Sequence, residues 1–293
     1  MLAAIRRAGL RVTTVVLGDR RDRARLAELR APVVLVDTIA AALAIPHLAD
    51  LRARGSEIVA LAHMRHGAMP LARRADRVIA VSRALSDDLV AEGIDRRKVV
   101  VVSPGRDGLE PHQPDRGRTI LCVANWTPAK GIHTLVAAVA RLPEVTLDLV
   151  GDMPDVAYAA RVRRAIAAGG LGARVRVHGT LGRSAVRHRY AAASIFALPS
   201  VREGYPIVLV EALAHGLPIV ACDIPAIREV TGGAAVLVAP RRVVPLAAAL
   251  TNLLINDRAR QKLARRAILR ARLLPTWADS ETRFVRAVRR KAA

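Results

Sequence analysis

The chain has 293 residues, a hydrophobic fraction of 52% and a formal net charge of +22 at pH 7. Its length suffices for two domains with separate cores, and its apolar content excludes an intrinsically disordered protein. Aromatic residues make up only 2%, so the core must consist of aliphatic side chains. We find no membrane-spanning stretch and no apolar core of a secretion signal in the first 17 residues, so we expect a cytoplasmic protein.

The first 112 residues alternate between helical and strand-like patterns, which is typical of a parallel sheet. Ser82 is placed to cap the helix that follows it. Helices are expected at Met1–Ala8, Arg21–Leu29, Ala40–Arg54 and Ala84–Glu92, and strands at Arg11–Leu17, Val33–Val36, Glu57–Ala62, Asp76–Val81 and Val99–Val102.

The segment Ser103–Arg118 is rich in proline, glycine and charge, and it reads as an interdomain linker. The alternation then resumes, so the whole chain is predicted to be α/β. Strands are expected at Thr119–Ala124, Thr146–Val150, Arg174–His178, Ile195–Leu198, Ile219–Ala221 and Ala234–Val238, and helices at Ile132–Leu142, Val156–Ala168, Arg183–Ala191, Val243–Ile255, Asp257–Leu273 and Thr276–Arg290.

The stretch Ser200–Gly216 holds two carboxylates, Glu203 and Glu211, at the start of a predicted helix. Pro206 suits the first helical position and Gly216 suits the helix end. Free amides near the helix start would bind an anion, with a carboxylate at each end for hydroxyl groups. A nucleotide diphosphate sugar has this layout. The alternative is a solvated loop glutamate and an ordinary helix glutamate.

Lys130 lies in the loop between a predicted strand and a predicted helix. An ammonium group beside the free amides of a helix N-terminus makes a phosphate site. The alternative is a solvated lysine in the first helical turn.

The segment EGYPIVLVEALAHGLPIVA resembles the E-x7-E signature of retaining glycosyltransferases of family 4. The resemblance implies the GT-B fold, in which two Rossmann-like domains face a cleft. Pro206 replaces the second glycine of the common motif. The positions that match are Glu203, Gly204, Glu211, Ala212, Gly216 and Pro218.

Further segments resemble the same family. Lys130 and Gly131 match the motif G-R-L-x-x-x-K-G, but Asn125 stands at the arginine position, which shifts more of the diphosphate onto Lys130. Gly151 falls in the position of a V-G-D-G motif. The turn Val177–Thr180 corresponds to one that contacts the nucleotide base, so Val177 and Gly179 are donor-site candidates.

In the first domain, the resemblance implies a histidine that faces the donor sugar. His63 is the better candidate and His66 the second, and the alternative is a loop histidine without chemistry. Ser82 and Arg83 resemble the family's V-S-x strand end. The family's first domain opens with a strand and a glycine-rich turn, whereas this sequence opens on a helix, so we expect the first strand to be missing.

We therefore predict an N-terminal acceptor-side domain over residues 1–112, a nucleotide-sugar-binding domain over 113–275, and a terminal helix over 276–293 that crosses back to the first domain. The predicted activity is that of a retaining glycosyltransferase, of hexosyltransferase type, that moves a sugar from a nucleotide-diphosphate donor to an unknown acceptor, whether glycan, lipid or small molecule.

The resemblance also implies a role for each site residue. Lys130, Asn125 and the helix amides would hold the diphosphate, Glu211 the ribose hydroxyls, and Glu203 the sugar hydroxyls. Glu203, His63 and Lys130 are the catalytic candidates. The remaining donor-site candidates are Gly151, Val177, Gly179, Gly204, Tyr205, Pro206 and Ile207. No D-x-D sequence occurs, so we expect no metal, and no cofactor besides the donor substrate.

Rival interpretations remain. On the same scaffold the chain could be a sugar phosphorylase, an epimerase or a catalytically impaired nucleotide-binding protein. The charge of +22 allows compositional bias, peripheral contact with an anionic membrane at its inner face, or nucleic acid. We expect no nucleic-acid partner, because the sequence has no recognition module and almost no aromatic residues for base stacking. Cys122 and Cys222 are expected to be buried free thiols.

Overall fold

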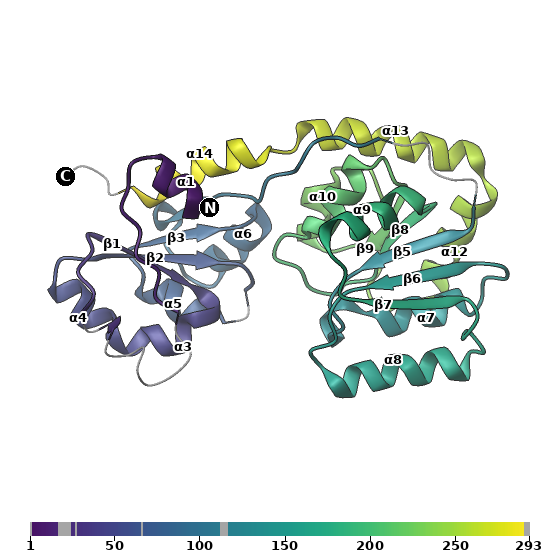
Figure 1. Ribbon diagram of the computed structural model, residues 1–293, viewed down its shortest axis with the longest axis horizontal. Helices are drawn as coiled ribbons and strands as arrows, with labels where there is room; N and C mark the ends of the chain where they lie inside the picture. Colours follow the sequence, from purple (N-terminus) through teal and green to yellow (C-terminus); the bar gives the residue numbers. More distant parts are fainter. Residues whose placement is uncertain (1, 17–24, 27, 66, 112–116, 290–293) are drawn as a thin grey trace. The chain divides into compact units, whose positions relative to one another are not determined.

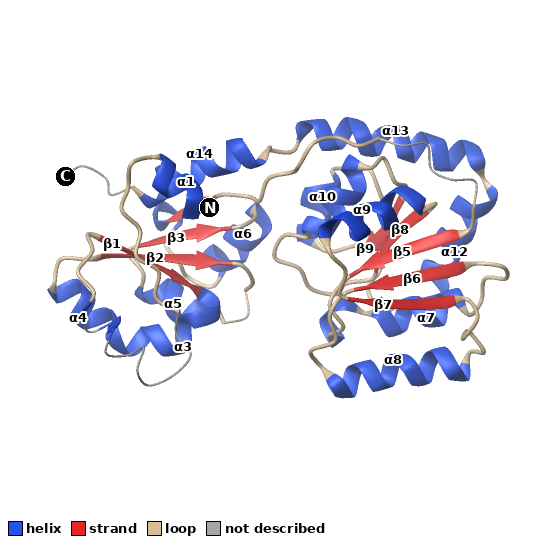
Figure 2. Ribbon diagram, in the orientation of Figure 1, coloured by secondary structure: helices blue, strands red, loops and turns tan. Residues whose placement is uncertain are grey.

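The computed structural model describes residues 2–16, 25–26, 28–65, 67–111 and 117–289 (Figure 1). Its contacts divide the chain into two compact units. The first unit comprises Met1–Gly105 together with Pro275–Ala293, and the second unit comprises Arg106–Leu274. Each unit has its own parallel sheet flanked by helices, so the chain is α/β as predicted (Figure 2).

The sheet of the first unit has the strand order β1-β2-β3-β4, and all its pairings are parallel. Each strand follows its neighbour in sequence, so the connecting segments return the chain to the same end of the sheet. The strands are β1 (Val33–Asp37), β2 (Glu57–Ala62), β3 (Arg77–Ala80) and β4 (Val99–Val101). The helices are α1 (Leu2–Arg7), α3 (Ala41–Ala44), α4 (Leu48–Ala53), α5 (Met69–Arg74), α6 (Arg83–Ala91) and α14 (Trp277–Val288), with short 3-10 turns η1 (Thr38–Ala40), η2 (Ile45–His47) and η3 (Arg96–Lys98).

The last helix, α14, completes the core of the first unit. Phe284 and Val288 pack into one apolar cluster with Ile5, Val59 and Ile79. Thr276 caps this helix and forms a reciprocal capping box with Asp279. The cluster therefore joins side chains from the two ends of the sequence.

The second unit has a six-stranded parallel sheet of order β10-β9-β8-β5-β6-β7. The strand β5 lies inside the sheet, with β8 on one side and β6 on the other. The strands are β5 (Thr119–Val123), β6 (Thr146–Val150), β7 (Val175–Gly179), β8 (Ile195–Leu198), β9 (Ile219–Cys222) and β10 (Val236–Val238), and the helices are η4 (Pro128–Lys130), α7 (Ile132–Val139), α8 (Val156–Ala168), α9 (Arg183–Ala192), α10 (Ile207–Ala214), α11 (Pro225–Thr231), α12 (Val243–Ile255) and α13 (Asp257–Leu273).

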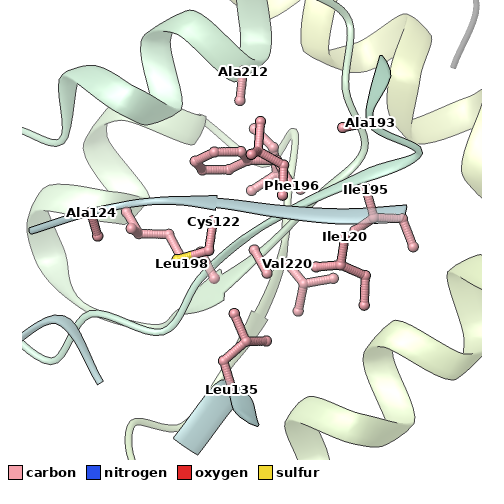
Figure 3. Close-up of a cluster of buried hydrophobic side chains, with 14 of the residues drawn as sticks. Ile120, Cys122, Ala124, Leu135, Ala193, Ile195, Phe196, Leu198, Ala212 and Val220 are labelled. Atoms are coloured by element: carbon pink, nitrogen blue, oxygen red, sulfur yellow. The ribbon is translucent and has the colours of Figure 1, made fainter. Parts of the chain in front are cut away.

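Both faces of this sheet are covered. Every residue of β8 and β9 is buried, which explains why these strands read as continuous apolar runs rather than as alternating ones. Figure 3 shows Ala212 of α10 on one side of the central strands and Leu135 of α7 on the other. Phe196 of β8 is fully buried in this core. The core is mostly aliphatic, as the composition requires, and its other buried aromatic residues are Trp126, Tyr158 and Tyr190.

Several predicted elements differ from the structure. Residues 11–16 are not a strand, although their pattern favours one. The side chains of Leu10 and Val12 instead pack on the core of the first unit. The predicted helix Ala40–Arg54 is interrupted by the turn η2, because Pro46 lacks the amide hydrogen that a continuous helix needs.

Three further helices differ from the prediction. Most of the predicted helix Arg21–Leu29 lies outside the described residues, although Arg25, Leu26 and Glu28 are helical. The short helices α5 and α11 were not predicted. Both carry a proline in their first turn, where proline is well tolerated.

The two cysteines are free and buried, as predicted. Burial raises the pKa of Cys122 to about 12 and that of Cys222 to about 11, so both thiols stay protonated. No helix among the described residues is long and apolar enough to cross a membrane.

Candidate functional site

Two neighbouring parallel strands of the second unit bring Lys130 and Glu203 together. Because β5 and β8 are adjacent and parallel, the segments after them leave the sheet at the same edge. Lys130 Nζ lies 2.7 Å from Glu203 Oε1 and 2.8 Å from Oε2. The Glu203 side chain is only 6% exposed and that of Lys130 is 26% exposed. A charge pair this sheltered keeps most of its attraction, since little solvent screens it.

The backbone around the pair is held tightly. Val201 N donates to Ala129 O at 2.8 Å, so the segment after β8 is tied to the turn that carries Lys130. Gly131 has a φ of +64° and lies against Pro199, where an added Cβ would meet the carbonyl oxygen at 2.3 Å. Only glycine fits this position, so the K-G dipeptide has a steric reason.

Two helices begin at this edge without a side-chain cap. The N-cap of α7 is Gly131, and the N-cap of α10 is Pro206. Pro206 was predicted to be the first residue of this helix, which instead begins one residue later, at Ile207. Uncapped helix N-termini present amide hydrogens that attract anions. The Lys130 ammonium and the free amides at the two helix N-termini therefore all suit the same kind of ligand, a phosphate or diphosphate.

Hydrogen bonds tie together the neighbouring segments at the ends of β5, β6 and β7. Asp152 N donates to Asn125 Oδ1 at 3.2 Å, and Gly151 N donates to Gly179 O at 2.9 Å. Gly151 has a φ of +143°, and an added Cβ would lie 2.1 Å from Ala124 O. Asn125 is thus used as an acceptor that positions the next loop, and its amide nitrogen remains the group that can donate to a ligand.

The other predicted donor-site residues lie in different surroundings. Val177 is inside β7, in register with Leu149, and is 40% exposed. Gly204 and Pro206 are buried, and Ile207 is 40% exposed at the start of α10. Burial raises the pKa of Tyr205 to about 12, so this phenol stays neutral.

Glu211 accepts a hydrogen bond from Tyr190, a residue that the sequence analysis did not single out. Tyr190 Oη lies 2.8 Å from Glu211 Oε2 and 3.2 Å from Val208 O. The tyrosine ring is buried and stacks on Phe196 and on His215. Burial raises the pKa of Glu211, and the bond from Tyr190 partly opposes this rise. The carboxylate is therefore held in one orientation at some electrostatic cost.

In the first unit, His63 pairs with Asp37. His63 Nε2 lies 2.9 Å from Asp37 Oδ2, and both side chains are 41% exposed. Asp37 is the last residue of β1, and His63 directly follows β2. Because these two strands are adjacent and parallel, the two side chains meet at the carboxyl edge of the sheet. The second oxygen of Asp37 accepts from Ile39 N at 2.9 Å. His66, the second histidine candidate, lies outside the described residues.

Ser82 caps α6 as predicted, since Leu85 N donates to Ser82 Oγ at 3.0 Å. No group of three or more potential metal ligands is found in the part of the chain that the structure describes.

Comparison with known proteins adds to this geometry. Residues 117–256 match the model of the family Glycosyl transferases group 1. The matched segment holds Lys130, Glu203 and Glu211, the residues that the sequence analysis singled out in the second unit.

Two curated relatives extend the likeness beyond this segment. A glycogen synthase of Mycobacterium tuberculosis is 32% identical over 218 residues, which cover 67% of this chain and 50% of the relative. An MMP alpha-(1->4)-mannosyltransferase of Mycolicibacterium hassiacum is 31% identical over 238 residues, which cover 76% of this chain and 57% of the relative. The chain thus spans little more than half the length of these relatives.

A solved structure shows the same fold. The Anabaena protein HepE in complex with UDP and glucose superposes with a TM-score of 0.80 at 22% identity, over 91% of this chain and 80% of HepE. The predicted GT-B fold is therefore confirmed. Together, the family match and the relatives support a glycosyltransferase.

The site also contains residues that sequence reasoning missed. Asp37 and Tyr190 each hold a predicted site residue, but they lie 26 and 21 positions away from it along the chain. Tyr190 carried one usable signal, since the chain has only three tyrosines and a buried one usually bonds a partner through its hydroxyl.

Proposed function

We propose that the protein is a retaining glycosyltransferase that moves a hexosyl group from a nucleotide-diphosphate sugar to an acceptor hydroxyl. The observation that carries this proposal is the ion pair of Lys130 and Glu203, placed between two uncapped helix starts at one sheet edge. The family match over residues 117–256 supports it.

In this proposal Lys130 exchanges partners when the donor binds. Its ammonium leaves Glu203 for the diphosphate, and the amides at the starts of α7 and α10 contact the same group. Negative charge grows on the diphosphate as the glycosidic bond breaks, so fixed positive groups lower the barrier. Asn125 supplies a hydrogen bond but no charge, so Lys130 carries most of this stabilisation.

Glu203, once released, would accept hydrogen bonds from hydroxyls of the transferred sugar. Glu211 would bind the ribose hydroxyls, in the orientation set by Tyr190. The acceptor would attack from the face that the leaving group departs, with the leaving phosphate taking the acceptor's proton. Neither glutamate is needed as a covalent nucleophile, and the proposed reaction uses no metal.

His63 would contact the sugar or the acceptor from the first unit. Its pairing with Asp37 supports this role, because a carboxylate at Nε2 fixes the ring tautomer and leaves Nδ1 as an acceptor for a hydroxyl. Gly151, Val177 and Gly179 would lie near the nucleotide base. Peripheral contact with an anionic membrane is part of the proposal, in view of the net charge of +22.

Calorimetric titration with UDP, GDP and ADP tests the donor site. UDP comes first, because the similar HepE structure contains UDP. We expect saturable binding of one diphosphate, weakened about tenfold or more by Glu211→Ala and by Lys130→Met. Turnover with the matching sugar donor should then transfer sugar with the anomeric configuration kept.

Two controls separate loss of the site from loss of the fold. The double variant Lys130→Met/Glu203→Gln removes both charges of the pair, so it should fold well and still bind the diphosphate weakly. If folded wild-type protein binds none of the three diphosphates, the proposed function is wrong. Demand for inorganic phosphate, or product formation without an acceptor, would instead indicate a phosphorylase or an epimerase.

A further inference from the structure

Helix α13 has one buried side and one side that faces solvent. Its buried residues pack on the second unit, where α13 contacts α10 and α12. The opposite side, which we call the α13 outer face, consists of exposed residues. At about 100° per residue its members fall within an arc of about 120° along about 25 Å of helix. They are Arg258, Lys262, Arg265, Arg266, Leu269, Arg272 and Leu273.

The outer face holds two exposed leucines one turn apart. Leu269 is 59% exposed and Leu273 is 76% exposed, and every other leucine whose side chain the structure describes is at least partly buried. Residues at i and i+4 lie side by side on a helix, so the two side chains form one apolar patch. Paired exposed apolar groups rimmed by polar ones are typical of a contact surface.

Five cations surround this patch. Within the described part of the chain, none of the five basic residues of the outer face has an ion-pair partner. The single acidic residue of α13, Asp257, bonds instead to the buried Arg260 at 2.6 Å. The outer face therefore presents uncompensated positive charge together with an apolar patch.

We propose that the α13 outer face docks the protein on an anionic lipid bilayer. The arginines and Lys262 would meet lipid phosphates, and Leu269 and Leu273 would enter the boundary between headgroups and acyl chains. This combination is what an interfacial helix needs, since the cations attract the surface and the leucines add apolar burial. A nucleic acid would match the cations but would leave the leucines in water.

The inference rests on the membrane contact proposed above, and it does not depend on the transfer reaction. Cosedimentation with vesicles of phosphatidylcholine containing about 30% phosphatidylglycerol tests it, with pure phosphatidylcholine vesicles beside them. We expect binding to the anionic vesicles only. Lys262→Gln/Arg265→Gln/Arg266→Gln should weaken it about tenfold or more, and Leu269→Ser/Leu273→Ser by a similar factor.

The matched control removes the same charge elsewhere. Arg161→Gln/Arg163→Gln/Arg164→Gln on α8 lowers the net charge by an equal amount, so it should weaken binding far less than the α13 variant. UDP titration of every variant checks the fold and keeps failure of docking distinct from failure of the donor site. Equal loss in the two triple variants, full binding by the leucine variant, or retention on duplex DNA but not on vesicles would each overturn the proposal.

Discussion

The two units of this chain build parallel sheets in different ways. The second unit is one continuous stretch, and every residue of its strands β8 and β9 is buried. The first unit is discontinuous, its strand β4 is half-exposed, and its core needs the final helix α14. The only two phenylalanines of the sequence lie one in each core. A continuous, doubly covered sheet can stand alone and hold a sheltered charge pair at its edge, whereas the first unit depends on the far end of the chain.

Removing the two phenylalanines should give the largest effects. Phe284→Ala should destabilise the first unit by about 3–5 kcal/mol through a cavity, and Phe196→Ala should do the same to the second unit. Hydrogen exchange read by mass spectrometry can follow the two units separately. The comparison predicts that each variant loses protection mainly in its own unit. Equal loss in both units after either substitution would show that they unfold together.

The next largest effect is expected from breaking the ion pair between Lys130 and Glu203. Lys130→Met leaves the Glu203 carboxylate, only 6% exposed, without its partner and should destabilise the second unit by about 3 kcal/mol. Adding Glu203→Gln should recover most of this loss, because no unpaired charge then remains. Chemical denaturation of the single and double variants measures the difference. If the double variant is as unstable as the single one, the pair matters for packing rather than for charge.

A smaller effect is expected at the positioning tyrosine. Tyr190→Phe keeps the ring between Phe196 and His215 but removes the hydrogen bond to Glu211. Diphosphate binding should weaken by about 1–2 kcal/mol, close to tenfold, while the fold persists. Calorimetry with the diphosphate that the wild type binds provides the value. Glu211→Ala combined with Tyr190→Phe should then lose little more than Glu211→Ala alone, since the two side chains act as a unit.

The smallest effect concerns pH. Burial raises the pKa of Glu211 above its ordinary value of 4.5, so the folded second unit binds a proton more readily than the unfolded chain. Its stability should therefore fall as pH rises from 4.5 through the raised pKa, and the favourable contribution is complete only below 4.5. Glu211→Gln should flatten this slope in denaturation curves taken across that range. An unchanged slope would assign it to other carboxyl groups.

Sequence patterns predicted the second unit better than the first for a physical reason. A fully buried strand such as Ile195–Leu198 shows as a continuous apolar run, and a long helix such as Val243–Ile255 shows helical periodicity. The structure has both with the predicted bounds. The segment after Arg11 has equally good strand propensity but pairs with no strand in its described part, because pairing depends on tertiary contacts that propensity does not report.

The candidate site divides in the same way. Lys130, Glu203 and Glu211 carry motif spacing, and the structure brings the first two into contact. Asp37 and Tyr190 could not be found by spacing, since each meets its partner only after distant elements have packed. Pairwise positioning of this kind is a property of the folded sheet edge rather than of any short segment.

The discontinuity of the first unit has a consequence for synthesis on the ribosome. Residues 1–105 emerge before the second unit, yet Phe284 and Val288, which belong to their apolar cluster, are added after it. The second unit, by contrast, leaves the ribosome as one uninterrupted stretch with its sheet complete. The first unit therefore starts to be made before the second unit but completes its core after it. A chain stalled before α14 would expose the apolar surface that chaperones bind.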